Sequence, residues 1–160
     1  MKQSISNQFS LEGKVVVITG AAGLLGEQHA RAVAEVGGTP VLLDILGDSV
    51  IEIAEKLAVE FNVPAAGYKL DITDESCIEV SVQTLLDRFN KIDGLVNNAA
   101  NNPKMENQDG KNFSRLENFP LEVWNSDLAV SLTGAFLCAK HYGTAISRNP
   151  KKGGVIINIS

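Results

Sequence analysis

Short apolar runs alternate with amphipathic segments along the chain. The runs at 15–18, 41–43 and 155–157 place apolar residues at consecutive positions instead of at every second one. Strands of this kind are typical of a parallel sheet whose two faces are both covered. Between the runs, apolar residues return at three- and four-residue steps, as they do along one face of a helix. The pattern predicts an α/β fold built on a doubly wound parallel sheet.

The expected elements follow one another without a linker, a repeat or a change of pattern, which predicts a single domain. Strands are expected at 15–18, 41–44, 66–70, 94–97 and 155–159, and helices at 24–36, 49–61, 73–89 and 121–147. Ser49 is the expected cap of the second helix, whose apolar residues Ile51, Ala54 and Leu57 are spaced for one buried face.

Three glycines separate the first strand from the first helix. Gly20, Gly23 and Gly26 stand in the run TGAAGLLG. Here a first glycine lets the chain turn, a second lets backbone approach a diphosphate, and a third lets the helix pack close to the sheet. Such a run alone also occurs in tight loops, but the strand before it and the helix after it, with Leu25 and Ala30 on its inner side, supply the required context. The motif predicts a Rossmann-type dinucleotide-binding domain.

Two acidic residues follow expected strands. Asp44 ends the second strand, 24 residues after Gly20, where a carboxylate can accept hydrogen bonds from an adenosine ribose. A solvated aspartate at a strand end is the simpler alternative. Asp71 follows the third strand, where open α/β sheets place their ligands, and it is equally suited to capping the next helix.

The fourth strand runs into two asparagines and two very small residues, Asn97, Asn98, Ala99 and Ala100. Small side chains beside a cofactor leave room for a flat ring, although asparagines also form ordinary turns. The following loop is long and polar, which indicates a mobile or ligand-binding segment. This loop carries three cationic side chains: Lys104, Lys111 and Arg115. They could bind a phosphorylated or nucleotide-linked substrate, but solvated surface charges are the simpler interpretation.

The longest expected helix, at 121–147, carries apolar residues around much of its axis. At three- and four-residue steps these are Trp124, Leu128, Leu132, Phe136 and Ala139. We expect Trp124 and Phe136 to lie in the core, and part of the helix to pack against a second subunit in a homo-oligomer. The histidines, His29 and His141, are expected to be surface or packing residues.

The composition excludes several classes of protein. The 160 residues are 44% hydrophobic, enough for the core of one domain, and the net charge of −5 without a basic run argues against nucleic-acid binding. No stretch is long enough to span a membrane, and the polar leader at 1–11 lacks the apolar segment of a secretory signal, so we expect a cytoplasmic protein. Cys77 and Cys138 lack ligand spacing, so we expect buried or half-buried thiols and no metal site.

Over almost its whole length, the chain resembles the short-chain dehydrogenase/reductase family. The resemblance rests on a set of motifs in their order and spacing: TGAAGLLG, Asp44, Asp71-Ile72, NNAA at 97–100 and VIINIS at 155–160. The resemblance implies NAD(P)-dependent oxidation or reduction of a hydroxyl/carbonyl pair on a small molecule. It implies these cofactor-binding residues: Gly20, Gly23, Leu25, Gly26, Asp44, Asp71, Ile72, Asn98, Ala99 and Ala100.

Two finer expectations concern the cofactor and the substrate. Asp44 would repel the 2′-phosphate of NADP, and no arginine follows it at 45–47 to neutralise that charge, which predicts NAD. The loop at 101–120 resembles that of the flagellin-modification short-chain dehydrogenases. This narrower resemblance implies a sugar or nucleotide-sugar substrate.

The sequence departs from the family pattern at three positions. Leu24 stands where the common form has its second glycine, and Ala100 replaces the last glycine of the NNAG-type motif. Ser131 occupies the place where many members of the family carry an active-site asparagine. Whether the family's usual proton-relay water is bound here is therefore an open question.

The family's catalytic Ser, Tyr and Lys have no match in the chain. Tyr68 and Tyr142 lack a lysine four residues later, and Ser160 matches the position before the catalytic serine. The last strand is apolar on both faces and needs a cover. We therefore expect a domain truncated after the fifth strand, inactive by itself, with the catalytic group beyond Ser160. The alternatives are a non-catalytic dinucleotide-binding module acting through protein contacts, and a methyltransferase-like fold, which NNAA argues against.

Overall fold

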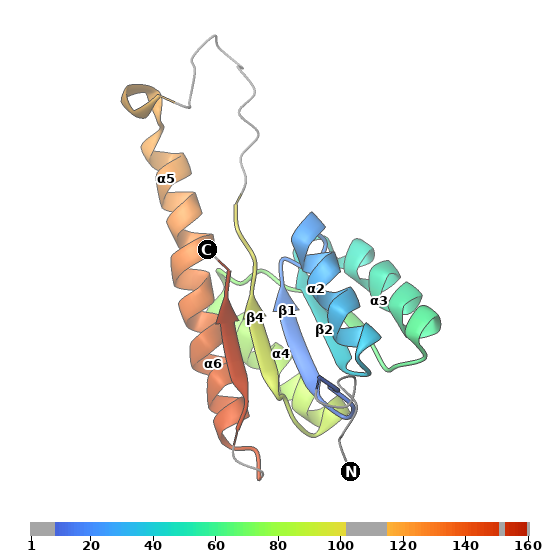
Figure 1. Ribbon diagram of the computed structural model, residues 1–160. Helices are drawn as coiled ribbons and strands as arrows, with labels where there is room; N and C mark the ends of the chain where they lie inside the picture. The colour runs from blue at the N-terminus through green and yellow to red at the C-terminus, as the bar shows by residue number, and fades with distance from the viewer. Residues whose placement is uncertain (1–8, 102–114, 151–152, 160) are drawn as a thin grey trace.

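The computed structural model describes residues 9–101, 115–150 and 153–159. Its strands are β1 (Val15–Thr19), β2 (Thr39–Asp44), β3 (Ala66–Lys69), β4 (Gly94–Asn97) and β5 (Val155–Asn158). Its helices are α2 (Leu24–Glu35), α3 (Gly47–Phe61), α4 (Glu75–Phe89), α5 (Leu121–Leu128) and α6 (Ala135–Ser147). The 3-10 turn η1 (Leu116–Asn118) precedes α5, and the π-helical segment η2 (Ala129–Gly134) joins α5 to α6 (Figure 1).

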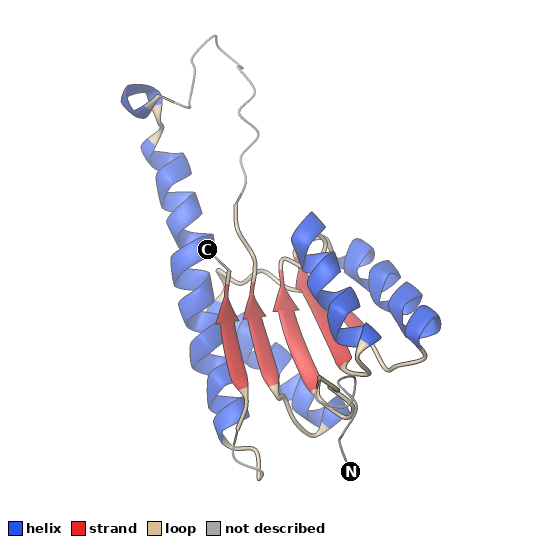
Figure 2. Ribbon diagram, viewed as in Figure 1, coloured by secondary structure: helices blue, strands red, loops and turns tan. Residues whose placement is uncertain are grey.

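The five strands form one parallel sheet in the order β3-β2-β1-β4-β5, which confirms the doubly wound fold (Figure 2). The chain moves outward from β1 to β3 and then returns to place β4 on the other side of β1. The direction of winding therefore changes between β1 and β4. Ligands of open α/β sheets bind at such a point, outside the carboxyl ends of the strands.

Alternate residues of β1 serve two separate cores. Val15 and Val17 belong to the core under α4 and α6, where Ile78, Leu85 and Tyr142 are buried. On the opposite face, Val16 and Ile18 pack with buried residues of α2 and α3. Both faces of the central strand are thus covered, as its unbroken apolar run predicts.

The ends of α3 and α4 are set by single polar residues that cap or stop the helix. Asp74 caps α4 by accepting hydrogen bonds from the backbone N–H groups of Ser76 and Cys77. Asn62 and Asn90 end α3 and α4 in the left-handed conformation, with φ of 53° and 63°. Asparagine tolerates this conformation better than most residues, which explains these two stops.

Several expectations about side chains are wrong. Helix α3 begins at Gly47, so Ser49 lies within its first turn instead of capping it, and Val50 takes the buried position expected for Ile51. Leu25, in the first turn of α2, is exposed, whereas Ala30, Val33 and Ala34 of the same helix are buried. Cys77 is exposed on α4, whereas Cys138 is buried as expected.

The long helical column is not regular and not buried as expected. The π-helical segment interrupts it, and α5 has no buried residue. Trp124 and Phe136, expected in the core, are 53% and 63% exposed. The column extends beyond the carboxyl edge of the sheet, so that no described element covers its outer side there (Figure 1).

The last strand, β5, pairs with β4 in the described part of the chain and has one open edge. Three of its apolar residues, Val155, Ile156 and Ile157, are exposed, and so is Ile159 directly after it.

No helix among the described residues is both long and apolar enough to cross a membrane. Lys104 and Lys111 lie outside the described residues, while Arg115 is exposed and pairs with Glu117 at 2.7 Å.

Candidate cofactor site

The glycine turn between β1 and α2 fits against the end of β4. Gly20 has a φ of +64°, and a Cβ placed on it would lie 2.7 Å from the Cα of Ala99. A Cβ on Gly26 would lie 2.7 Å from the Cα of Ala21, inside the turn itself. Both positions exclude a side chain because the atoms in the way are backbone. At Gly23 the nearest atom is the Gly20 carbonyl oxygen, 3.3 Å away, so this position is tight but less constrained.

Helix α2 begins at this turn without a side-chain cap. The first N–H groups of a helix lack partners within the helix, and the helix dipole adds positive potential there. Together with the room left by Gly20 and Gly26, this makes a cradle that a diphosphate fits. The residues present therefore suit a dinucleotide.

Asp44, at the end of β2, is bound to the glycine turn. Its Oδ2 accepts a hydrogen bond from the Ala22 N–H at 3.0 Å, and its Oδ1 accepts one from the Leu46 N–H at 3.0 Å. A carboxylate offers about four lone-pair positions, so acceptor capacity remains for a ribose hydroxyl. The side chain therefore has a structural task that its position in the sequence did not reveal.

Thr19 and Asn98 join β1 to β4 at the point where the winding changes. The Thr19 hydroxyl accepts hydrogen bonds from the N–H groups of Asn98 and Ala99 at 3.1 and 3.2 Å. The Asn98 side-chain amide donates to the carbonyl oxygens of Thr19 and Gly20 at 3.0 and 3.1 Å. Sequence reasoning missed Thr19, although a buried hydroxyl directly before a glycine turn is a usable signal.

Two cavities lie beside this turn and meet at Ala99 and Ala100, which line both. The lining of the smaller one, about 140 Å³, includes Gly20, Asp44, Asp71 and Ile72. The larger one, about 670 Å³, brings in Leu25, Asn98, Ser131 and Phe136. The predicted site residues are thus divided between two adjoining spaces, while Gly23 and Gly26 shape the turn next to them.

Of the two roles left open for Asp71, its position fits the one at a ligand site and not the one as a helix cap. It lines the smaller cavity, but its Oδ1 accepts from the N–H and hydroxyl of Thr73, at 2.9 and 2.7 Å. The cap of α4 is Asp74 instead. Hydrogen bonds from Ser76 and Cys77 hold the pKa of the Asp74 carboxyl below its usual value.

Asn97 connects the sheet to the long helical column. It is 5% exposed, and its Nδ2 donates to the Ala135 carbonyl at 3.3 Å and to the Asn158 Oδ1 at 2.9 Å. Its Oδ1 is buried without a hydrogen-bond partner among the described residues. Ser131, in η2, lines the larger cavity that Asn97 and Asn158 also reach.

Neither tyrosine lines these two cavities. Tyr142 is buried in α6, where desolvation raises the pKa of its phenol. Tyr68 lies on β3, and its hydroxyl accepts a hydrogen bond from Arg88 at 2.9 Å. In the described part of the chain, therefore, no tyrosine is placed to exchange a proton with a molecule in either cavity.

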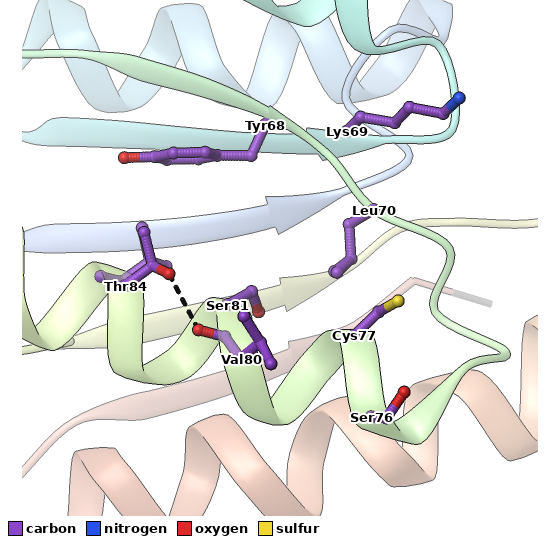
Figure 3. Close-up of a pocket in the computed structure, with 9 residues that line it drawn as sticks. Tyr68, Lys69, Leu70, Ser76, Cys77, Val80, Ser81 and Thr84 are labelled. Carbon is purple, nitrogen blue, oxygen red and sulfur yellow. Dashed lines mark hydrogen bonds between the residues drawn. The ribbon is translucent and has the colours of Figure 1, made fainter.

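A third cavity, of about 310 Å³, lies between β3 and α4 and is mostly apolar. Figure 3 shows the Tyr68 ring above Thr84, with Cys77 further along α4. A hydrogen bond to Asp74 raises the pKa of the Cys77 thiol, which favours the protonated, unreactive form. This cavity contains none of the glycine-turn residues and shares only Leu70 with the smaller cavity.

One cluster outside the site has metal-ligand side chains. Atoms of Glu75, Glu79 and His141 lie within 4.8 Å of one another. Glu75 already pairs with Lys140 at 2.6 Å and with the His141 Nε2 at 2.7 Å. These contacts join α4 to α6, and both His141 and His29 are half-buried on helices, in the places expected of packing residues.

The family model for short chain dehydrogenases matches residues 14–160, and the chain belongs to this family. It is 34% identical over 154 residues to trans-4-hydroxycyclohexanecarboxylate dehydrogenase from Sinomonas cyclohexanicum, covering 92% of this chain and 54% of that protein.

Two solved structures share its fold. NADPH-dependent 3-quinuclidinone reductase from Rhodotorula rubra has a TM-score of 0.81 and 25% identity, covering 99% of this chain and 56% of that one. NAD⁺-bound xylitol dehydrogenase has a TM-score of 0.78 and 27% identity, covering 92% and 53%. The chain thus spans about half the length of the relatives it matches.

Proposed function

We propose that this chain is the cofactor-binding part of an NAD-dependent oxidoreductase that interconverts a hydroxyl and a carbonyl group. The observation that carries the proposal is the meeting of two cavities at Ala99 and Ala100, directly beside the glycine turn and at the change in winding. A dinucleotide needs two adjoining spaces and an anion cradle between them. The chain's membership of the short chain dehydrogenase family supports the same conclusion.

In this proposal the smaller cavity takes the adenosine half of the cofactor, with Asp44 accepting from the ribose and Ile72 beside the adenine. The glycine turn and the start of α2 hold the diphosphate. The larger cavity takes the nicotinamide half, which supplies the hydride acceptor or donor when bound. There the small side chains of Ala99 and Ala100 leave room for a ring, and Ser131 offers a hydroxyl.

The described residues provide binding and orientation but no group of the family's proton-transfer set. Proton transfer requires an acid or base within hydrogen-bond reach of the substrate oxygen. Because Tyr68 and Tyr142 lie outside both cavities, we expect this group to be supplied from elsewhere in the whole protein, and residues 1–160 alone to show no turnover. A non-catalytic module would instead show no turnover in the whole protein as well.

For the substrate, we propose a hydroxyl/carbonyl pair on a polyhydroxylated, sugar-linked molecule, as in flagellin modification. Two observations support this class: the resemblance of the loop at 101–120, and a likeness to xylitol dehydrogenase, whose name specifies a sugar alcohol. The whole protein, assayed with NAD and a panel of nucleotide sugars against simple alcohols, tests the choice. Turnover of simple alcohols alone would contradict it.

We further propose NAD(H) as the cofactor, although the relatives include both NAD- and NADPH-linked proteins. Asp44 places a negative charge where NADP carries its 2′-phosphate, and it is anchored there by the amides of Ala22 and Leu46. We expect the chain to bind NADH at least about tenfold more tightly than NADPH, a difference typical of one charge contact. Titration calorimetry at constant ionic strength measures both affinities.

Asp44→Asn is the matched variant for this test. The amide keeps one acceptor oxygen for the backbone and removes the charge. The difference in affinity between NADH and NADPH should therefore become smaller, mainly because NADPH binds more tightly. Tighter binding of NADPH than NADH by the unmodified chain would refute the assignment of Asp44.

A further inference from the structure

The π-helical segment η2 (Ala129–Gly134) lies where the two cavities adjoin. Val130 lines the smaller cavity, while Ser131 and Leu132 line the larger one. Consecutive side chains of one turn therefore belong to different cavities. Single π-helical turns within longer helices have less favourable hydrogen-bond geometry than α-helix and occur often at functional sites.

One end of this turn rests directly on a wall of the smaller cavity. A Cβ on Gly134 would lie 2.7 Å from both the Cδ1 and the Cγ1 of Ile72, and 3.2 Å from the Ile72 carbonyl oxygen. Ile72 is only 7% exposed and lines the smaller cavity. Because protein interiors are close-packed, a shift of Ile72 cannot be absorbed by empty space at Gly134.

The same end of the turn is also tied to the sheet. The Asn97 Nδ2 donates to the carbonyl of Ala135, the residue after the turn, at 3.3 Å. On the other end the turn continues into α5, none of whose residues is buried. Val130 packs against the core cluster that contains Ile72. The turn is thus held through Ile72 and Asn97, and its remaining freedom lies toward α5.

We propose that Ile72 and Gly134 are positioning residues that couple the two cavities, so that a nucleotide bound in the smaller cavity sets the position of Ser131 in the larger one. The inference rests on the proposed function, because it assigns the adenosine half to the smaller cavity. An occupant pressing on Ile72 fixes the place of Gly134, and with it the turn that carries Ser131. A glycine kept for packing alone would affect stability without linking the cavities.

Adenosine monophosphate tests this directly, because it is too short to reach both cavities. A trifluoromethyl label attached at Ser131→Cys, in a Cys77→Ser background that removes the exposed native thiol, reports the position of the turn by fluorine NMR. The same label at Ser147→Cys, on the exposed end of α6, is the control. We expect the nucleotide to shift the resonance at residue 131 and to leave that at residue 147 unchanged.

Ile72→Ala should abolish the shift at residue 131 while the nucleotide still binds at a raised concentration. Gly134→Ala should weaken nucleotide binding about tenfold in the native background and much less in the Ile72→Ala background, as expected for residues in contact. Gly143→Ala is the matched control, since its Cβ would meet only the flexible Ile156 Cδ1, at 3.0 Å.

Two results separate the failure of this inference from that of the proposed function. If the nucleotide binds by calorimetry but the label at residue 131 does not respond, or responds equally with Ile72→Ala, the coupling is refuted and the cofactor site stands. If neither adenosine monophosphate nor NADH binds, the proposed function and the coupling both fall.

Discussion

At the scale of single residues, three polar side chains hold backbone at the glycine turn: Asp44 and Asn98, which also line a cavity, and Thr19, which is buried. Asp44 binds two amides, Asn98 binds two carbonyls, and Thr19 accepts from two N–H groups. These hydrogen bonds fix the glycine turn to both β2 and β4. The shape of the site is therefore maintained by Asp44 and Asn98, which the sequence suggested as ligand contacts or as ordinary strand-end and turn residues, and by Thr19, which it did not single out.

Asp93 has a comparable role at the opposite end of the sheet. Although burial disfavours its charge, hydrogen bonds from the Val15 N–H and from Lys91 and Lys14 outweigh this and lower the pKa of its carboxyl. The Asp93 Oδ2 lies 3.0 Å from both the Val15 N and the Lys91 Nζ. The charged carboxylate thereby joins the beginnings of β1 and β4.

We predict that Asp93→Asn lowers the free energy of unfolding at pH 7 by about 1–3 kcal/mol, the range for a hydrogen-bonded charged group. A carboxyl whose pKa is lower in the folded state stabilises the protein above its unfolded pKa of about 4, and this contribution is lost as the pH falls through the folded value. The difference between wild type and variant should therefore shrink below about pH 4. Urea unfolding at several pH values measures it, and a difference independent of pH would contradict the account.

At the scale of elements, the helical column has an exposed apolar stripe, of which Leu132 and Phe136 line the larger cavity. Trp124, Leu128, Leu132 and Phe136 recur every four residues and are all more than a third exposed. Exposed apolar patches of this kind mark interaction surfaces. We propose that a second copy of the chain covers the α5 part of the stripe, Trp124 and Leu128, because these two side chains are exposed and line neither cavity.

We predict that Trp124→Glu shifts the whole protein toward the monomer, since a buried charge at an apolar interface is costly. Trp124 lines neither cavity, so nucleotide binding should persist. Val59→Glu, at an 85% exposed position of α3, is the matched control. Light scattering after gel filtration gives the mass. An unchanged mass for Trp124→Glu would place the subunit contact elsewhere.

At the scale of the whole molecule, stability is distributed unevenly across the sheet. β1 pairs with strands on both sides and has helices on both faces, whereas β5 pairs only with β4 among the described residues and is exposed along its length. Local opening requires less energy where few apolar contacts are buried. The site lies next to the more stable region.

We predict that amide hydrogen exchange in the chain is slowest in β1 and fastest, among the five strands, in β5. The buried Val17 and Ile18 amides should exchange only with global unfolding, and those of Ile156 and Ile157 through local opening. Exchange measured by NMR or mass spectrometry separates the two. Equal protection of β1 and β5 would show that another surface covers β5.

The sequence by itself determined the strands, the helices α2, α3 and α4, the parallel arrangement of the sheet and the position of the glycine turn. These follow from local rules: unbroken apolar runs require cover on both faces, and glycine is required at Gly20 and Gly26, where a Cβ would clash with backbone. Helix α3 likewise ends at residue 61, as its expected range predicts, and Asn62 follows it in the left-handed conformation.

Only the tertiary structure decided which side chains were covered and which atoms met across the sheet. A periodic pattern indicates an apolar face but not whether anything packs against it, so the exposure of Trp124 and Leu25 was not predictable. The π-helical turn ends at Gly134, which lies against Ile72, a residue 62 positions earlier in the chain. Long-range contacts of this kind arise from the fold as a whole, because no local pattern specifies them.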